Sequence, residues 1–257
     1  MGKIISFANQ KGGVGKTTTA VSVAACMGVK GKKVLLVDID PQGNATSGMG
    51  VNKRQVTHST YDLLVMDEVP LESVVKKTDY QNVDILPSNM QLAGAEIELV
   101  DLEDRTNRLK QALLPAKDKY SYIVIDCPPS LGLITLNALT ASDSILIPIQ
   151  CEYYALEGLS QLMSTMRQVK RLYNPSIEIE GVLFTMYDGR LNLTTQVVEE
   201  VKKYFPKKVF KTVIPRNVKI SEAPSFGKPV YYYDRYSKGS ICYSELTNEI
   251  IHNNKGV

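Results

Sequence analysis

A glycine-rich turn near the start of the sequence constrains what this chain can fold into more than any other stretch. Residues 9–18 read Asn-Gln-Lys-Gly-Gly-Val-Gly-Lys-Thr-Thr. The apolar residues 4–8 before the turn predict a buried parallel strand, and the Ala- and Val-rich residues 19–30 after it predict a helix. A strand, a glycine-rich turn and a helix start form a phosphate cradle, because backbone N–H groups and the helix dipole converge on an anion.

Two side chains of this turn have the chemistry that a nucleotide phosphate and its metal require. Lys16 is expected to reach the β- and γ-phosphates, and the Thr17 hydroxyl is expected to be a Mg²⁺ ligand. The turn departs from the general phosphate-loop pattern G-x-x-x-x-G-K-[ST], because Gln10 stands at its first glycine and Lys11 adds a second lysine. Two lysines and two threonines in this setting argue against a purely structural glycine turn.

Predicted strands and helices alternate along the whole chain. Strands are expected at residues 4–8, 33–38, 83–86, 122–125, 145–149, 179–186 and 209–214. Helices are expected at residues 19–30, 61–66, 71–75, 92–114, 131–141, 156–173, 193–204 and 243–251. Such alternation predicts an α/β fold, a mostly parallel twisted sheet with helices on both faces. No linker, repeat or low-complexity segment interrupts it, so we expect a single-domain P-loop NTPase over residues 1–257.

Acidic residues follow two of the predicted strands. Asp38 and Asp40 come at and just after the second strand, and Asp126 follows the apolar residues 122–125. Ligands of open α/β sheets bind beyond the carboxyl ends of the strands, so these carboxylates should lie near the phosphate turn. We expect Asp126 to hold Mg²⁺ directly or through water. A simple helix-capping role remains the alternative for Asp38.

Composition narrows the class of protein further. A chain of 257 residues that is 44% hydrophobic can bury a large core, and we expect neither a signal peptide nor an apolar run of the ~20 residues that a membrane span needs. The cysteines form no C-x-x-C pair, so we interpret them as small buried hydrophobes in a reducing cytosol. They are Cys26, Cys127, Cys151 and Cys242.

Positive charge is concentrated in the second half of the chain. Residues 1–150 carry 15 Lys and Arg against 16 Asp and Glu, whereas residues 151–257 carry 15 against 11. Residues 202–219 contain no acidic residue, and their basic members are Lys202, Lys203, Lys207, Lys208, Lys211, Arg216 and Lys219. A stretch with only positive charges beside a nucleotide site indicates a polyanion partner, although a solvated surface is the simpler interpretation.

Several of these motifs resemble one protein family. Residues 11–17, Lys-Gly-Gly-Val-Gly-Lys-Thr, match the deviant Walker A motif of the ParA/MinD group of P-loop ATPases. Residues 37–44, 126–132, 150–158 and 214–218 resemble the short chromosomal ParA proteins, often called Soj. The resemblance covers essentially the whole chain. It implies a cytoplasmic, nucleoid-associated ATPase that binds ATP and Mg²⁺ and forms a homodimer when ATP is bound.

The resemblance also implies roles for individual residues. Lys11 would cross the dimer interface to the partner's phosphates, and Asp40 would position the attacking water, so Lys11, Lys16 and Asp40 are the catalytic candidates. Arg190 and Lys219 resemble positions that hold double-stranded DNA without reading its sequence, although the family often has Arg at position 219. A ParB-type centromere-binding protein would stimulate hydrolysis. With Pro215 and Asn217 bordering the adenine, the expected nucleotide contacts are Lys11, Gly12, Gly13, Val14, Gly15, Lys16, Thr17, Thr18, Pro215 and Asn217.

Two alternatives stay open. A MinD-like membrane-associated ATPase would end in a basic amphipathic helix, and residues 249–257 are too short and too weakly charged for one. A bacterial tyrosine kinase of the same loop type would carry a tyrosine cluster, which residues 231–236 offer. We interpret that stretch instead as an edge strand. The sequence leaves open whether a chromosome or a plasmid is segregated.

Overall fold

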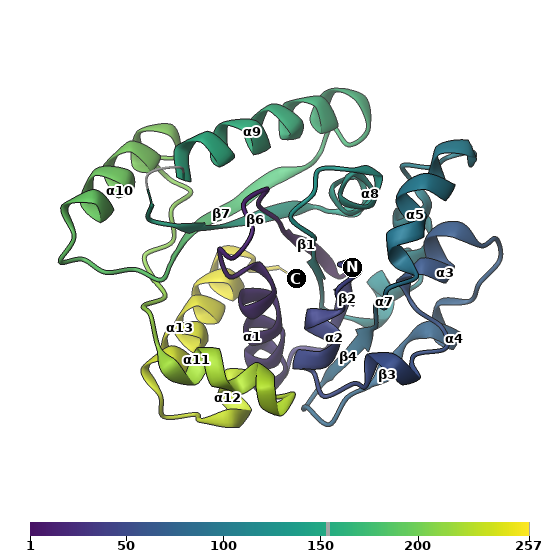
Figure 1. The fold of residues 1–257 in the computed structure, drawn as a ribbon, viewed down its shortest axis with the longest axis horizontal. Coiled ribbons are helices and arrows are strands. Elements are labelled where there is room, and N and C mark those ends of the chain that lie inside the picture. Colours follow the sequence, from purple (N-terminus) through teal and green to yellow (C-terminus); the bar gives the residue numbers. More distant parts are fainter. Residues whose placement is uncertain (153–154, 257) are drawn as a thin grey trace.

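A twisted sheet of seven strands lies at the centre of the described chain, residues 1–152 and 155–256 of the computed structural model (Figure 1). The strands are β1 (Lys3–Phe7), β2 (Val34–Asp38), β3 (Lys76–Lys77), β4 (Val83–Leu86), β5 (Tyr122–Asp126), β6 (Ser144–Gln150) and β7 (Glu178–Thr185). Their order across the sheet is β3-β4-β2-β5-β1-β6-β7. Within the described residues every pairing of these strands is parallel except that of β3 with β4.

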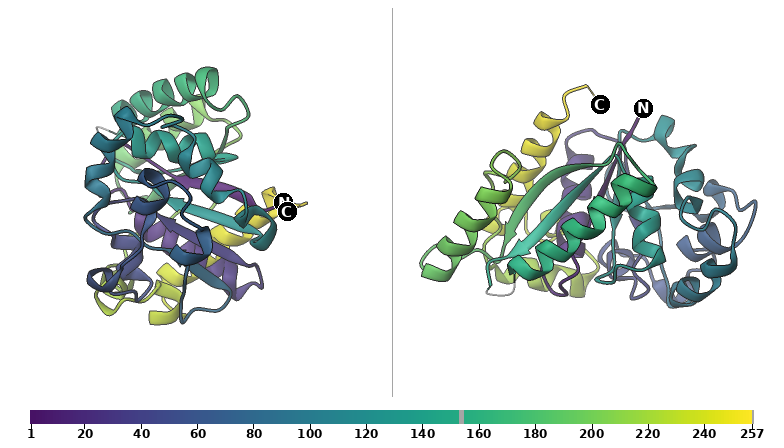
Figure 2. Two further views of the ribbon diagram at one scale, coloured as in Figure 1. Left: turned by 90° about the vertical axis from the view of Figure 1, so that its right-hand side faces the viewer. Right: turned by 90° about the horizontal axis from the view of Figure 1, so that it is seen from above.

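Helices cover both faces of this sheet (Figure 2). Those of five or more residues are α1 (Lys16–Val29), α2 (Asn44–Gly48), α3 (Thr60–Val65), α5 (Leu92–Glu98), α6 (Arg108–Leu113), α8 (Leu133–Ala141), α9 (Ala155–Leu172), α10 (Asn192–Tyr204), α11 (Val218–Glu222) and α13 (Lys238–Asn253). The four-residue helices are α4 (Leu71–Val74), α7 (Ala116–Lys119) and α12 (Val230–Tyr233), and the 3₁₀ turns are η1 (Lys53–Gln55), η2 (Leu99–Asp101) and η3 (Ala223–Phe226). The expected α/β fold with a mostly parallel sheet is therefore confirmed.

Alternate residues of each strand enter two separate cores. Ile4 belongs to a core that also contains side chains of α3, α5, α6, α8, α9 and α10, whereas Ile5 belongs to a second core with side chains of α1, α12 and α13. Both side chains are fully or almost fully buried. Because parallel strands are buried on both faces, they appear in sequence as continuous apolar runs, and that is why their positions could be predicted.

The segment at residues 209–214 is not a strand, so that prediction was wrong. An isolated bridge joins Val209 to Val182 of β7, and a second joins Pro215 to Tyr187, two residues beyond that strand. Between these bridges the amides of Lys211 and Thr212 donate to the carboxylate of Glu249 on α13, at 2.8 and 3.1 Å. The Thr212 amide, which a continuous strand would turn toward β7 as it does the Phe210 amide, is thus bonded to a side chain from a distant helix instead.

Two further predictions were wrong in detail. The expected helix at residues 92–114 is interrupted after η2, where Asp104 adopts a positive φ of 50° and the Asn137 amide donates to the Arg105 carbonyl at 2.7 Å. The tyrosines at 231–233 lie in helix α12 rather than in an edge strand. The Tyr232 ring packs against Tyr80, with centroids 4.7 Å apart, and this contact anchors α12 beside β4.

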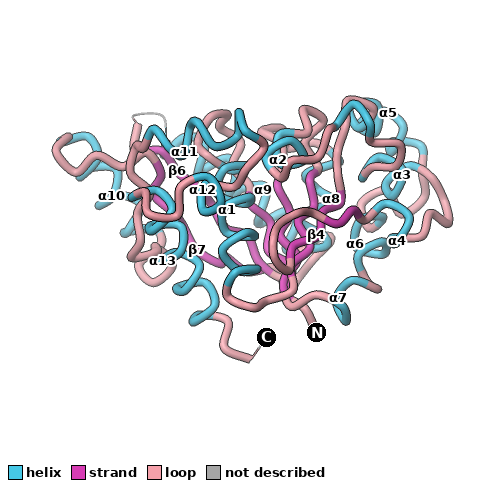
Figure 3. Tube along the Cα trace, turned by 90° about the horizontal axis from the view of Figure 1, so that it is seen from below, coloured by secondary structure: helices cyan, strands magenta, loops and turns pink. Residues whose placement is uncertain are grey.

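The carboxyl ends of the central strands meet at one edge of the sheet. In the strand register, Phe7 of β1 and Asp38 of β2 both lie opposite Asp126 of β5. Helices α2 and α11 lie at this edge, and the two ends of the chain lie at the other (Figure 3). Parallel pairing therefore gathers the phosphate turn and the acidic residues into one place.

Candidate active site

Two glycines give the phosphate turn its shape. Gly13 and Gly15 have φ angles of 74° and 85°, in the left-handed region that residues with a side chain rarely adopt. Gly15 is the residue before α1, which has no side-chain cap and no acidic residue in its first turn. The first N–H groups of α1 are therefore left for an anion.

The turn is attached to the neighbouring strands by side-chain hydrogen bonds. The Asn9 amide donates to the Pro148 carbonyl of β6 at 2.7 Å, and its oxygen accepts the Lys11 amide at 3.0 Å. From the end of β7, the Thr185 hydroxyl donates to the Val14 carbonyl at 2.8 Å. These bonds fasten the turn to β6 and to the end of β7.

The two lysines of the turn have different surroundings. Lys16 is buried, and its ammonium donates to the Lys11 carbonyl at 3.1 Å, across the turn. Burial lowers the pKa of Lys16, while the nearby carboxylates of Asp126 and Asp40 oppose that shift. The Lys11 side chain is more exposed and forms an ion pair of 2.7 Å with Glu152, which follows β6. Lys11 must leave this ion pair if it is to reach a second subunit.

Asp38 and Asp40 are held by different partners. One oxygen of Asp38 accepts the Asp40 amide at 3.1 Å, and the other accepts the amide and the hydroxyl of Thr46 at 2.7 Å each. Burial raises the pKa of Asp38 to about 6, and its hydrogen bonds with Thr46 and the Asp40 amide oppose the shift. Asp40 Oδ1 accepts the Gln42 amide at 2.9 Å. The structure thus gives Asp38 a role in ordering the loop, whereas Asp40 lies near enough to the Lys16 ammonium for its charge to raise the pKa of that lysine.

Asp126 has no conventional hydrogen-bond partner among the described residues, although it is fully buried. Burial raises its pKa well above the usual range, and the nearby charge of Asp38 raises it further. The Thr17 hydroxyl and the Lys16 ammonium lower this pKa, although Thr17 falls short of regular hydrogen-bond geometry. A buried carboxylate without partners is costly, so this site fits a group that brings positive charge.

The metal would need ligands from outside the protein. In the described part of the chain, no group of three or more His, Cys, Asp or Glu side chains is placed to hold a metal ion. Mg²⁺ is commonly held by one or two protein oxygens together with water and substrate phosphates. Asp126 and Thr17 beside a phosphate turn match that pattern.

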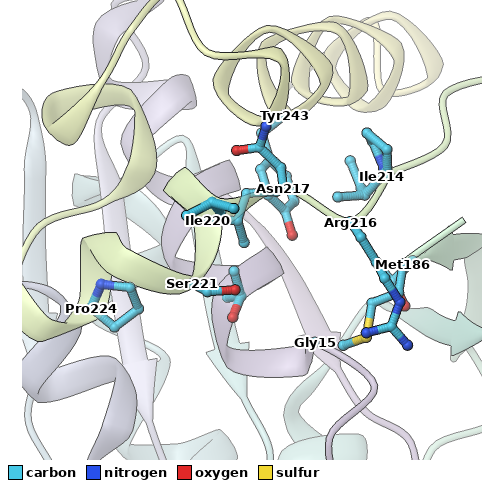
Figure 4. Close-up of a pocket in the computed structure, with 13 residues that line it drawn as sticks. Gly15, Met186, Ile214, Arg216, Asn217, Ile220, Ser221, Pro224 and Tyr243 are labelled. Carbon is cyan, nitrogen blue, oxygen red and sulfur yellow. The ribbon is translucent and has the colours of Figure 1, made fainter.

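A pocket of about 530 Å³ opens beside the phosphate turn (Figure 4). Pro215 and Asn217, the expected adenine contacts, both line it. The remaining lining residues come from the phosphate turn, α1, the end of β7, the loop before α11, α11 itself, η3 and α13: Gly15, Thr18, Thr185, Met186, Ile214, Arg216, Val218, Ile220, Ser221, Pro224 and Tyr243. Its volume suits a small-molecule ligand, and its position continues the phosphate turn.

The two expected DNA contacts lie outside this pocket and already have acidic partners. The exposed Arg190, in the loop between β7 and α10, forms a bidentate ion pair with Asp188, at 2.9 and 2.6 Å. Lys219 on α11 pairs with Glu222 at 2.9 Å and lies 5.5 Å from the Tyr233 ring centroid. Exposed pairs of this kind are weak, at ~0–1 kcal/mol, so DNA phosphates could replace the carboxylates.

The basic window at residues 202–219 does not lie on one face. Because residues 209–215 run parallel to β7, they carry the chain from beside Val182, in the middle of that strand, to beyond its carboxyl end. Lys208 lines a hollow with Glu178 and Ile179 at the amino end of β7, whereas Arg216 and helix α11, which carries Lys219, lie at the carboxyl end beside the phosphate turn.

Sequence reasoning missed several residues that shape the site. Glu152, Thr185 and Tyr243 contact the turn or line the pocket from more than 130 positions away in the chain. The strand-end rule could have found Thr185, the last residue of β7, and Glu152, which follows β6. No local pattern marks Tyr243. Tyr153 and Tyr154, in the motif at residues 150–158, lie outside the described residues.

Comparisons with known proteins place this geometry among nucleotide-binding partition proteins. A family model described as "AAA domain" matches residues 2–179. The sporulation initiation inhibitor protein Soj of Bacillus subtilis is 60% identical over 98% of this chain and 100% of its own length. The chromosome partitioning protein ParA of Myxococcus xanthus is 52% identical over 98% of this chain and 88% of its own length.

Solved structures agree on the fold. Cobyrinic acid a,c-diamide synthase of Mycobacterium smegmatis, with bound ADP and magnesium, is 35% identical over 100% of this chain and 97% of its own, with a TM-score of 0.86. A plasmid partition protein of Borrelia burgdorferi bound to AMPPNP has a TM-score of 0.83 at 28% identity, over 99% of this chain and 100% of its own. The cell division ATPase MinD of Pyrococcus furiosus has a TM-score of 0.79 at 28% identity, over 98% of this chain and 100% of its own.

Proposed function

The chain belongs to the ParA and Soj family of chromosome-partitioning ATPases, and from that membership we propose that it is a DNA-segregation switch driven by ATP hydrolysis. One observation carries the proposal. Lys16, Asp40 and the unpartnered carboxylate of Asp126 converge where the central strands end. Phosphoryl transfer needs these parts: a cation for the phosphates, a metal ligand and a group that orients water.

ATP and Mg²⁺ would bind together at this edge of the sheet. Asp126 is the main reason to expect a metal ion here, because its two buried oxygens have no hydrogen-bond partner among the described residues. With Thr17, Asp126 would hold Mg²⁺ directly or through water. When bound, the ion supplies positive charge to the β- and γ-phosphate oxygens. Pro215 and Asn217 would border the adenine in the adjoining pocket.

The protein's own groups would perform the remaining steps. The amides of the turn and the Lys16 ammonium would bind the phosphates and balance the charge that develops on them. Asp40 would accept a hydrogen bond from the attacking water and orient it toward the γ-phosphate. Its Oδ1 already accepts the Gln42 amide, and no described residue donates to Oδ2, so that oxygen is left for water.

ATP would also bring two copies of the chain together. Lys11 would leave Glu152 and contact the phosphates of the partner subunit. Gly12 and Gly13 are exposed at the tip of the turn, as a close approach of two turns requires. Dimerisation would double the basic surface around Arg190 and Lys219, so the ATP form would bind double-stranded DNA and associate with the nucleoid. A ParB-type partner would stimulate hydrolysis and release it.

The relatives favour this function over the two alternatives. The Soj protein of B. subtilis matches at 60% identity and the chromosome partitioning protein ParA of M. xanthus at 52%, whereas the MinD structure matches at 28%. Within the described residues, no helix is long and apolar enough to cross a membrane. The tyrosines that suggested a kinase have structural partners: Tyr232 accepts the Gln81 amide, and Tyr233 donates to Glu222.

The proposal is tested by measuring DNA affinity in each nucleotide state. Asp40→Ala should bind ATP and accumulate as a dimer, because it lacks only the group that orients water. This dimer should bind any duplex DNA more tightly than the ADP-bound or nucleotide-free protein. Lys16→Ala is the matched control that should bind no ATP. Equal DNA affinity in all states would overturn the switch, and wild-type turnover by Asp40→Ala would remove its catalytic role.

A further inference from the structure

Three polar residues behind Asp40, which the proposed chemistry does not use, form a hydrogen-bond network with its backbone. Asp38 ends β2, Thr46 lies in α2, and Ser88 lies two residues beyond β4. Asp38, Thr46 and Ser88 are fully buried, and Asp40 is 8% exposed. The network therefore joins two strand ends and a helix beneath the loop that carries Asp40.

The Thr46 hydroxyl is the central link. It donates to the Asp38 carboxylate at 2.7 Å and accepts the Ser88 amide at 2.9 Å. The Thr46 amide donates to the same Asp38 oxygen at 2.7 Å. Every partner of this hydroxyl is thus in place. A methyl group in its position would leave the buried Ser88 amide without a bond and would remove one of the two bonds that this Asp38 oxygen accepts.

The network holds both sides of the Asp40 backbone. The Asp40 amide donates to Asp38 Oδ1 at 3.1 Å, and the Asp40 carbonyl accepts the Ser88 hydroxyl at 2.7 Å. The loop also passes Ser88 closely, since a Cβ added at Gly43 would lie 3.0 Å from the Ser88 carbonyl oxygen. With its backbone fixed on both sides and Oδ1 bonded to Gln42, the Asp40 carboxylate has little freedom to turn.

We propose that Thr46 and Ser88, acting with Asp38, are positioning residues that hold Asp40 in the orientation needed to direct water at the γ-phosphate. The inference rests on the proposed function, since it assigns a support to the same carboxylate. It makes catalysis depend on residues that touch neither nucleotide nor metal. Preorganisation of this kind affects turnover rather than substrate binding, because the bonds orient a group that acts only in the transition state.

Thr46→Val tests the central link, because valine keeps the shape of threonine and removes only the hydroxyl. We expect kcat for ATP to fall roughly ten- to a hundredfold, the range for hydrogen bonds that involve a charged group, with KM within about twofold of wild type. The ATP-bound dimer should accumulate as it does in Asp40→Ala. Thr46→Ser keeps the hydroxyl and should retain kcat within a few-fold of wild type.

A matched control separates positioning from a general loss of packing. Thr247 on α13 is also fully buried, and its hydroxyl donates to the Tyr243 carbonyl at 2.7 Å. Thr247→Val should leave kcat close to that of the wild type. Ser88→Ala removes the bond to the Asp40 carbonyl alone and should lower kcat without changing KM, which tests the network even if Thr46→Val does not fold.

Combining variants gives the decisive result. If Thr46 acts through Asp40, the double variant Thr46→Val, Asp40→Ala should be no slower than Asp40→Ala alone. Additive losses would overturn the inference, as would wild-type kcat in both Thr46→Val and Ser88→Ala while the wild-type protein hydrolyses ATP. Absence of hydrolysis in the wild type would instead contradict the proposed function itself.

Discussion

Asp126 illustrates, at the scale of one residue, a conflict between stability and function. The raised pKa means that the folded, nucleotide-free protein binds a proton at Asp126 more tightly than the unfolded chain does. Stability from this residue is therefore fully present below the pKa of an unfolded aspartate, about 3.9, and is lost as the pH rises through the folded pKa. Asp38, with a pKa raised to about 6, acts in the same direction.

Asp126→Asn should remove the loss of folding stability that a buried, ionised Asp126 causes at neutral pH. We expect the nucleotide-free variant to unfold at a higher temperature than wild type near neutral pH, with the difference shrinking as the pH approaches about 4. Thermal unfolding measured across this pH range checks it. Adding Mg²⁺ and a non-hydrolysable ATP analogue should stabilise wild type more than the variant. If the difference in unfolding temperature between Asp126→Asn and wild type stayed the same at all pH values, ionised Asp126 would not destabilise the folded protein.

Gly12 allows a cleaner test of dimerisation than the other glycines of its turn. A Cβ added at Gly12 would meet nothing within 4 Å in the single chain, and its φ is not positive. Gly12→Val should therefore fold and bind nucleotide as a monomer, yet fail to form the ATP dimer, because two turns could not approach closely. Light scattering with ATP measures this. Gly12→Ala should be impaired less, and a normal Gly12→Val dimer would contradict the predicted interface.

At the scale of secondary-structure elements, the chain beside β7 divides the basic window into two groups. Arg190→Ala with Lys219→Ala should weaken ATP-dependent DNA binding for any sequence and flatten its log–log salt slope by about 0.9 for each lost phosphate contact. Lys207→Ala with Lys208→Ala removes the same charge toward the amino end of β7. This second pair should change neither the DNA affinity nor the salt slope. DNA titrations across a salt series compare the affinities of the two double variants. Equal losses would mean that the place of a lysine or arginine on the surface does not matter for DNA binding.

Local patterns predicted the elements wherever burial alone determines the structure. β1, β2, β5 and β6 are continuous apolar runs, and each was predicted to within about two residues. The failures occur where a distant side chain competes with the backbone, as Glu249 does for the amides of Lys211 and Thr212. Helix α12 was predicted as a strand because alternating tyrosines resemble an edge strand, whereas contacts with Tyr80 and Gln81 decide the outcome.

In the candidate site, residues that directly follow a strand could be predicted, and contacts between distant residues could not. The turn and Asp126 follow strands directly, so the sequence places them at one edge of the sheet. The support of Asp40 by Ser88 and the pairing of Lys11 with Glu152 join residues that are 48 and 141 positions apart. Such contacts follow from the packed fold, and nothing in the sequence around either residue indicates them.

At the scale of the whole molecule, Lys11 is the residue that we propose reaches from one chain to another. Its ion pair with Glu152 is partly exposed, so opening it should cost only ~0–1 kcal/mol. We expect Lys11→Ala to bind ATP as a monomer but to lose ATPase activity roughly 10³-fold or more, by analogy with an arginine finger. Lys76→Ala, on strand β3 at the edge of the sheet, is the control and should keep wild-type turnover. Full activity in Lys11→Ala would show that no lysine acts across the interface.

Both margins of the sheet are closed in a similar way. On one side, β3 contains only Lys76 and Lys77, and on the other the segment after α10 brings Lys207, Lys208 and Lys211 alongside β7. An open strand edge is a template for aggregation, and short, lysine-bearing edges resist the addition of another strand. This protein works at high local concentration if it coats DNA, where uncontrolled strand addition would lead to amyloid-like fibres. The lysines that contribute least to DNA binding would then protect the protein from self-association through its sheet.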